Sequence, residues 1–166
     1  MGMFELKPLS REAVGRALEK AERYRLLNEP GEAESICLDV LGVEPENQQA
    51  LITLLLARTD EFEERTGEVA RAQEVVPRLE GQYERAYYAG IIYERKAKAQ
   101  LKRSGPGMGA VAQGGFRQAM SLYEKAEGLR PPGNDDALLR WNACARVLER
   151  LPRVESPQEE YEAPLE

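Results

Sequence analysis

The sequence predicts an all-α protein. Apolar residues recur three and four positions apart through most of residues 11–151, which is the spacing of amphipathic helices. Short groups of Pro, Gly and Asn separate these runs, and no segment shows the two-residue alternation typical of a strand. A pattern also recurs 36 residues along the chain, where residues 31–33 align with residues 67–69. We therefore expect one domain built from helical repeats.

The first half of this domain contains four predicted helices. Residues 11–27 are rich in Ala, Leu, Glu and Arg, and the sequence Asn-Glu-Pro-Gly stops this first helix. Residues 32–41 predict a second helix with its apolar residues on one face. Residues 48–59 predict the third helix. Residues 68–79 predict the fourth, which Pro77 should end or bend.

The second half predicts three more helices and one long loop. Residues 82–103 have the pattern of one long helix. Residues 104–115 hold five glycines and one proline, a composition that favours a loop over a helix. Residues 116–129 predict the next helix, and Asn134 is placed to cap a last helix over residues 135–151.

The two ends of the chain differ from the helical domain. Residues 1–10 form a lead segment, and residues 152–166 form a tail with three prolines, one arginine and five glutamates. The tail therefore carries a net charge of −4, which leaves −2 for the rest of a chain whose total is −6. We expect an acidic, proline-rich segment of this kind to be disordered.

The composition excludes several kinds of chemistry. The chain has no histidine, so it cannot form a Ser-His or Cys-His nucleophile pair or a His-containing zinc site. Its two cysteines, Cys37 and Cys144, lie 107 positions apart and do not form a metal-binding cluster in the sequence. The net negative charge argues against nucleic acid as the main ligand. We predict no catalytic residue, no cofactor and no metal.

The location of the protein is also predicted. The strongest apolar run, residues 50–57, is shorter than the roughly 20 residues that a helix needs to cross a bilayer. The first residues lack the apolar stretch of a secretory signal. We expect a cytoplasmic protein that does not enter the membrane.

Small, aromatic and proline residues occupy equivalent places in two of the predicted units. The first set is Ala21, Tyr24, Ala33, Cys37 and Pro45, and the other is Gly90, Tyr93, Ala119, Tyr123 and Pro131. In this pattern the chain resembles the tetratricopeptide repeat family over roughly residues 11–151. A small residue on the first helix of a pair allows the second helix to approach closely. The middle unit departs from the pattern, since Leu55 and Arg58 replace the small and aromatic residues.

The resemblance implies a right-handed stack of about three helix pairs with a capping helix at residues 135–151. It also implies a partner-binding groove lined by the first helix of each pair. Carried over position by position, the groove residues are Leu18, Glu22, Arg25, Ile52, Leu56, Thr59, Tyr87, Ile91, Glu94, Leu139 and Arg146. Because the middle of this set is apolar, we expect a protein or peptide partner with apolar anchors.

Other interpretations of these residues stay open. The apolar groove residues are equally explained as packing between neighbouring helices. The tyrosines form either a binding hot spot or the filling of a wide helix interface; they are Tyr83, Tyr87, Tyr88 and Tyr93. The predicted function is a non-enzymatic interaction module, which is an adaptor, scaffold or chaperone-like protein, with a homo-oligomer as an option. A chaperone similar to those of type III secretion is one alternative. Another is an enzyme or small-ligand binder that uses paired carboxylates such as Glu80 and Glu84, one helical turn apart.

Two further features have competing explanations. The long helix ends in a basic run of Arg95, Lys96, Lys98, Lys102 and Arg103. Cations favour the C-terminal end of a helix, but such a run also suits an acidic partner or the acidic tail of the chain itself. Glycine-rich residues 105–109 do not match a phosphate-binding loop, because no strand precedes them and no Gly-Lys-Ser or Gly-Lys-Thr follows.

Overall fold

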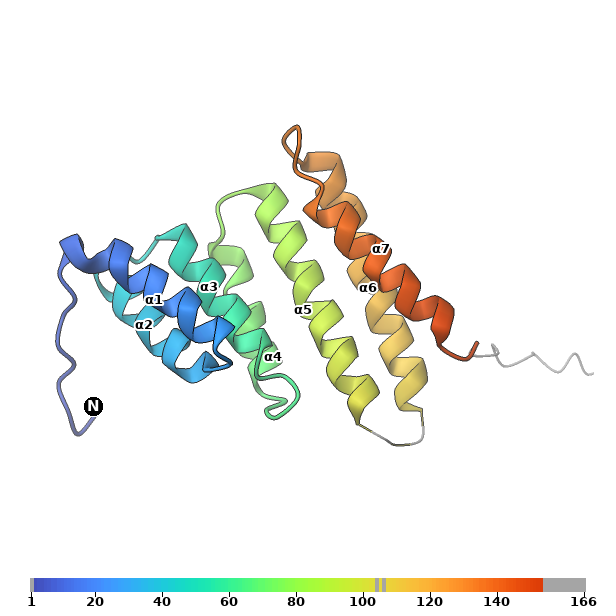
Figure 1. Ribbon diagram of the computed structural model, residues 1–166, viewed down its shortest axis with the longest axis horizontal. Helices are drawn as coiled ribbons and strands as arrows, with labels where there is room; N and C mark the ends of the chain where they lie inside the picture. The colour runs from blue at the N-terminus through green and yellow to red at the C-terminus, as the bar shows by residue number, and fades with distance from the viewer. Residues whose placement is uncertain (1, 104, 106, 154–166) are drawn as a thin grey trace, which may run out of the picture.

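The structure is a computed structural model that describes residues 2–103, 105 and 107–153. Within these residues it contains seven α-helices, two short 3-10 helices and no strand, which confirms the all-α prediction (Figure 1). The α-helices are α1 (Val14–Leu26), α2 (Pro30–Val43), α3 (Gln48–Thr59), α4 (Glu68–Gln73), α5 (Gln82–Lys102), α6 (Met108–Leu129) and α7 (Asp136–Arg150). The 3-10 helices are η1 (Arg11–Ala13), before α1, and η2 (Val76–Arg78), after α4.

A tight turn joins α1 to α2. Asn28 in this turn has a left-handed backbone conformation with φ 60°, which asparagine tolerates better than most residues. Pro30 begins α2, where its missing N–H costs no helical hydrogen bond. Two small residues at the contact, Ala21 and Ala33, are fully buried, so the two helices pack closely.

The helix α3 is the most buried element of the first half. It contacts α1, α2, α4 and α5, so side chains on several of its faces are buried, including Leu51, Leu54 and Leu55. Its start is capped by Asn47, whose side-chain oxygen accepts a hydrogen bond from the Ala50 N–H at 2.9 Å. The predicted boundaries of this helix, residues 48 and 59, are therefore confirmed, and the Asn47 cap explains why the helix begins at residue 48.

The helix α4 is shorter than predicted. It ends at Gln73, and the expected helix over residues 68–79 is replaced by α4 and η2. A proline within a helix clashes with the carbonyl group four residues before it, and for Pro77 that residue is Gln73. The helix ends before Pro77, as predicted, but it already ends at Gln73.

The prediction of a loop over residues 104–115 is wrong for most of its length. Helix α6 begins at Met108, so the three glycines at 109, 114 and 115 are helical. A glycine weakens a helix by about 1 kcal/mol relative to alanine. Tertiary packing offsets this cost, because Ala112 and Phe116 are fully buried in the core. A Cβ atom at Gly115 would lie only 3.1 Å from the Cβ of Ala97, so glycine permits the close approach of α5.

Each helix contacts the next in chain order from α1 to α7, and α3 also contacts α1 and α5. The buried apolar residues form two cores, one mainly under α1 to α4 and one under α5 to α7. Leu56 and Tyr88 contact both cores. The handedness of the stack and its relation to the tetratricopeptide family stay predictions.

The last helix packs against α6, as a cap would (Figure 1). Asn134 contributes to its start, since its side-chain oxygen accepts a hydrogen bond from the Asp136 N–H at 3.1 Å. After α7 the chain returns to α6, where Gln113 Nε2 donates to the Pro152 carbonyl oxygen at 2.8 Å. Disorder was predicted for the tail at residues 152–166, of which residues 154–166 lie outside the described residues. Among the helices described, none is both long enough and apolar enough to cross a membrane.

Substitution of Gly90 by alanine should destabilise the protein by about 1–3 kcal/mol, the usual cost of overpacking a core. A Cβ atom at Gly90 would lie 2.6 Å from Cε1 of Tyr123, which is itself fully buried and cannot move aside. Urea unfolding measures the effect. The matched control is Gly114→Ala in α6, where a Cβ atom meets nothing within 4 Å and should stabilise the helix by about 0.5–1 kcal/mol. Equal effects of the two substitutions would contradict this account.

Candidate functional site

The candidate site is the face formed by the odd-numbered helices α1, α3, α5 and α7, called here the odd-helix face. Contacts between α1 and α3 and between α3 and α5 bring three of these helices side by side. Polar side chains add links across the face. Gln49 Nε2 on α3 donates to Glu22 Oε1 on α1 at 3.3 Å, and Arg140 on α7 donates to Glu94 on α5.

The predicted groove residues fall into three groups by exposure. Exposed residues are Glu22, Leu139 and Arg146, and half-buried residues are Arg25, Ile52, Leu56 and Tyr87. The other four, Leu18, Thr59, Ile91 and Glu94, are buried, with at most 8% of their surface exposed. These four belong to the interior of the fold, so their assignment to an accessible groove is corrected. For Leu18 and Ile91 the alternative of packing between helices applies.

The buried Glu94 joins three helices. Its carboxylate accepts hydrogen bonds from Tyr123 Oη on α6 at 3.1 Å and from Lys98 Nζ on its own helix at 2.8 Å. Arg140 Nε on α7 donates at 3.1 Å, and a second guanidinium nitrogen completes a forked pair. Cys144 Sγ lies at 3.4 Å. Burial by itself would raise the pKa of Glu94, but the bonds and charges of Arg140 and Lys98 outweigh it and lower the pKa.

A second ion-pair group joins α1, α3 and α5. Asp60, which follows α3, accepts hydrogen bonds from Arg25 Nε at 2.8 Å and from Arg25 Nη2 at 3.2 Å. Arg95 Nη1 on α5 lies 3.3 Å from the same carboxylate. Arg25 was predicted from the sequence as a groove residue, but Asp60 was not, because its position after the helix gives no periodic signal. The pairing holds Arg25 against the fold and leaves it only half-exposed.

Tyrosines gather at the start of α5. The ring of Tyr87 stacks on Tyr83 with centroids 5.7 Å apart, meets Tyr88 edge-on at 5.0 Å and lies 5.8 Å from Tyr123. Burial raises the pKa of Tyr87 to about 12, so its hydroxyl is protonated at neutral pH. The cluster fills the space between α5 and its neighbours and leaves Tyr87 half-buried. These contacts agree with the interpretation that the tyrosines fill a helix interface, and the interpretation as a binding hot spot stays a prediction.

The basic run at the end of α5 is mostly paired within the fold. Lys98 bonds to Glu94, and Lys102 Nζ lies 2.7 Å from Glu63. Arg103 Nη2 donates to the Phe62 carbonyl oxygen at 3.0 Å. These partners account for most of the run without an acidic ligand, which favours the structural interpretation over docking of the acidic tail there.

Three carboxylates form the only group in the described residues that has a metal-like arrangement. Oxygens of Glu34, Glu61 and Glu68 lie within 4.8 Å of one another. Arg71 donates to Glu34 at 2.7 Å and to Glu68 at 2.9 Å, and Arg58 lies 3.3 Å from Glu34. These guanidinium groups supply the compensating positive charge, so the cluster is explained as an ion-pair network.

The carboxylate pair considered for an enzyme does not have the expected geometry. Helix α5 begins at Gln82, so Glu80 lies before the helix and not one turn from Glu84 within it. The prediction that these two carboxylates lie one turn apart on a helix is therefore wrong.

The two cysteines are buried. Burial raises the pKa of the Cys37 and Cys144 thiols to about 12, which keeps them protonated and unreactive.

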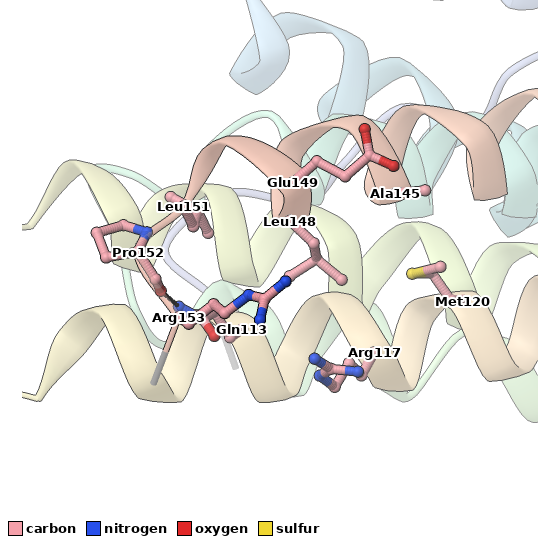
Figure 2. Close-up of a pocket in the computed structure, with 9 residues that line it drawn as sticks. All are labelled: Gln113, Arg117, Met120, Ala145, Leu148, Glu149, Leu151, Pro152 and Arg153. Carbon is pink, nitrogen blue, oxygen red and sulfur yellow. Dashed lines mark hydrogen bonds between the residues drawn. The ribbon is translucent and has the colours of Figure 1, made fainter. Parts of the chain in front are cut away.

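A pocket that the sequence analysis did not predict lies between α6 and α7, with a volume of about 540 Å³. Met120 and Leu148 provide apolar surface, and Figure 2 shows the side chains of Arg117 and Arg153 on one side of it. Glu149 directs its carboxylate away from these arginines in the same view. The pocket belongs to the end of the stack and includes no predicted groove residue.

Comparison of the chain with protein-family models finds no match, and comparison with curated proteins finds none either.

Substitution of Glu94 by glutamine should lower the free energy of unfolding by about 2–3 kcal/mol at neutral pH, because buried charge-assisted bonds are lost. The pKa of Glu94 is lower in the folded state than in the unfolded state, so the carboxylate stabilises the fold above its unfolded pKa of about 4.3. This contribution disappears as the pH falls through the folded pKa. The stability difference between wild type and variant, measured by urea unfolding, should therefore narrow in acid.

The matched control for this prediction is Glu63→Gln. Glu63 and its partner Lys102 are both largely exposed, with side-chain exposures of 52% and 66%. Exposed ion pairs contribute about 0–1 kcal/mol, so this substitution should have little effect at either pH. A Glu94→Gln effect as small as that of Glu63→Gln would show that the buried network does not stabilise the fold.

Proposed function

We propose that the protein is a non-enzymatic interaction module of the tetratricopeptide repeat type, which binds a peptide segment of a partner protein on its odd-helix face. The observation that supports this is the packing of successive helices in chain order, with α1, α3 and α5 side by side. Stacked helix pairs of this kind create an extended surface whose residues come from many parts of the chain. Such a surface suits recognition of a long, thin ligand.

The residues that remain accessible on the odd-helix face indicate which side chains a partner would need. Ile52, Leu56 and Tyr87 are half-buried on α3 and α5, and Leu139 on α7 is 60% exposed. Glu22 lies exposed near one edge and Arg146 near the other. Apolar anchors spaced along a peptide would cover the aliphatic and aromatic side chains.

Most of the charge on this face is already paired internally. Arg25 and Arg95 bind Asp60, and Arg140 binds Glu94. A partner would have to break these pairs to use the arginines as carboxylate clamps, at a cost in free energy. Recognition through apolar contacts avoids this cost. The proposal therefore favours a peptide held by side-chain anchors over one held by its terminal carboxylate.

Peptides can be selected from a random display library for binding to the full chain. The selected peptides should bind the odd-helix face. Leu139→Glu should weaken their binding roughly tenfold, which corresponds to about 1.4 kcal/mol, because a charge replaces an apolar contact. Leu38→Glu on α2 is the matched control, since Leu38 is 48% exposed and lies on an even-numbered helix. Fluorescence anisotropy with a labelled peptide measures both affinities.

A second readout locates the binding surface. On addition of the peptide, amide chemical shifts of the labelled protein should change along α1, α3, α5 and α7. Thermal unfolding of each variant checks that the substitution leaves the fold intact. Peptides that shift mainly α2, α4 and α6, or that bind Leu139→Glu and wild type equally, would contradict the proposal.

A further inference from the structure

We propose that residues 154–166, the part of the acidic tail that follows Arg153, bind in the pocket between α6 and α7 of their own chain, and that their glutamates pair with Arg117 and Arg153. The pocket contains no predicted groove residue. The proposal therefore does not depend on peptide binding at the odd-helix face.

The pocket presents two arginines without an acidic partner. Arg117 comes from α6 and Arg153 from the segment after α7, and both side chains are exposed. Among the described residues neither arginine forms an ion pair. Figure 2 shows the two guanidinium groups on one side of the pocket, while Glu149, the one acidic residue of the lining, points away from them. Both guanidinium groups can therefore accept a carboxylate, with which arginine forms two parallel hydrogen bonds.

Most of the remaining lining is apolar. It consists of Met120, Ala145, Leu148, Leu151 and Pro152, together with the polar Gln113. The pocket volume of about 540 Å³ lies within the range of about 300–1,000 Å³ that is usual for ligand sites. A ligand that matches this lining carries negative charge next to an apolar group.

The sequence of residues 154–166 has this chemistry. The segment contains five glutamates and neither lysine nor arginine, so its net charge is −5. The pocket lining contains two arginines and one glutamate, so its net charge is +1. The apolar Val154 directly precedes the first glutamate, Glu155. The charges of the segment and the pocket are therefore complementary, and an apolar side chain stands beside the first carboxylate.

The chain already runs along the pocket where this segment begins. Pro152 and Arg153 line the pocket, and Gln113 Nε2 on α6 donates to the Pro152 carbonyl oxygen at 2.8 Å (Figure 2). The rise along α6 from Gln113 to Arg117 is about 6 Å. Two residues of extended chain span about 7 Å, so Glu155 is within reach of Arg117.

Tethering favours this segment over a free anionic ligand. A segment joined to its site by a short linker meets that site at an effective concentration of about one millimolar. An acidic, proline-rich segment cannot form a core of its own, but segments of this composition can become ordered when they bind a surface. Binding of residues 154–166 neutralises both arginines and covers the apolar lining between α6 and α7.

A spin label on the full chain tests the proposal. A nitroxide is attached at Ser156→Cys, and the two native cysteines do not react because they are buried and protonated. Met120 and Ala145 lie at the end of the pocket away from Arg153 (Figure 2). The amide signals of these two residues should broaden when the segment is bound. Added salt should reduce the broadening, because it screens the ion pairs.

Charge reversal in the pocket gives the expected loss. In Arg117→Glu/Arg153→Glu the ratio of bound to unbound segment should fall at least roughly tenfold, and the broadening at Met120 and Ala145 should fall with it. Arg16→Glu is the matched control, since it makes the same charge change at an exposed arginine on α1, at the other end of the stack (Figure 1). Its broadening should equal that of wild type. Circular dichroism checks that each variant keeps its helices.

Reversal of the charges on both sides distinguishes pairing from a general effect of charge. Glu155→Arg/Glu159→Arg alone should abolish the broadening, and its combination with Arg117→Glu/Arg153→Glu should restore it. Unlabelled chains mixed with nitroxide-labelled chains should show no broadening, because the contact forms within one chain. Equal broadening in wild type and Arg117→Glu/Arg153→Glu, no restoration in the combined variant, or broadening between chains would overturn the proposal.

Discussion

The second half of the structure depends on one buried carboxylate. Glu94 on α5 accepts hydrogen bonds from Tyr123 on α6 and from Arg140 on α7, so a single side chain fixes three helices relative to one another. A charge in the interior requires such partners, because an unpaired one would cost several kcal/mol. The absence of a side chain at Gly90 allows Tyr123 to reach this position. The polar network and the close packing therefore require each other.

This network connects the last helix to the two helices before it. Helix α7 packs against α6 along one side, and Arg140 crosses to α5. In the first half of the stack, Asp60 has a comparable role, since it binds Arg25 on α1 and Arg95 on α5. The two ion-pair groups link odd-numbered helices whose apolar packing is mostly with their even-numbered neighbours. They stabilise the arrangement of the candidate face without adding free charge to it.

The same arrangement divides the surface into parts with different chemistry. The odd-helix face has apolar residues in its middle and few unpaired charges, which suits a peptide ligand. The pocket between α6 and α7 combines a mainly apolar lining with two arginines, Arg117 and Arg153, which suits an acidic segment.

The sequence by itself determined the helical class and most helix positions, including α3 at residues 48–59 and the long α5, because periodicity and caps are local signals. It also placed Gly90 as the small residue on the first helix of a unit and Tyr123 on the second, but the contact between them is known only from the structure. Only the tertiary structure decided that residues 108–115 are helical, since the burial of Ala112 and Phe116 outweighs the weak helix propensity of the glycines. It likewise decided that Glu94 is buried while Leu139 is exposed. Periodicity assigns a residue to a side of a helix, but the neighbouring helices determine whether that side meets water.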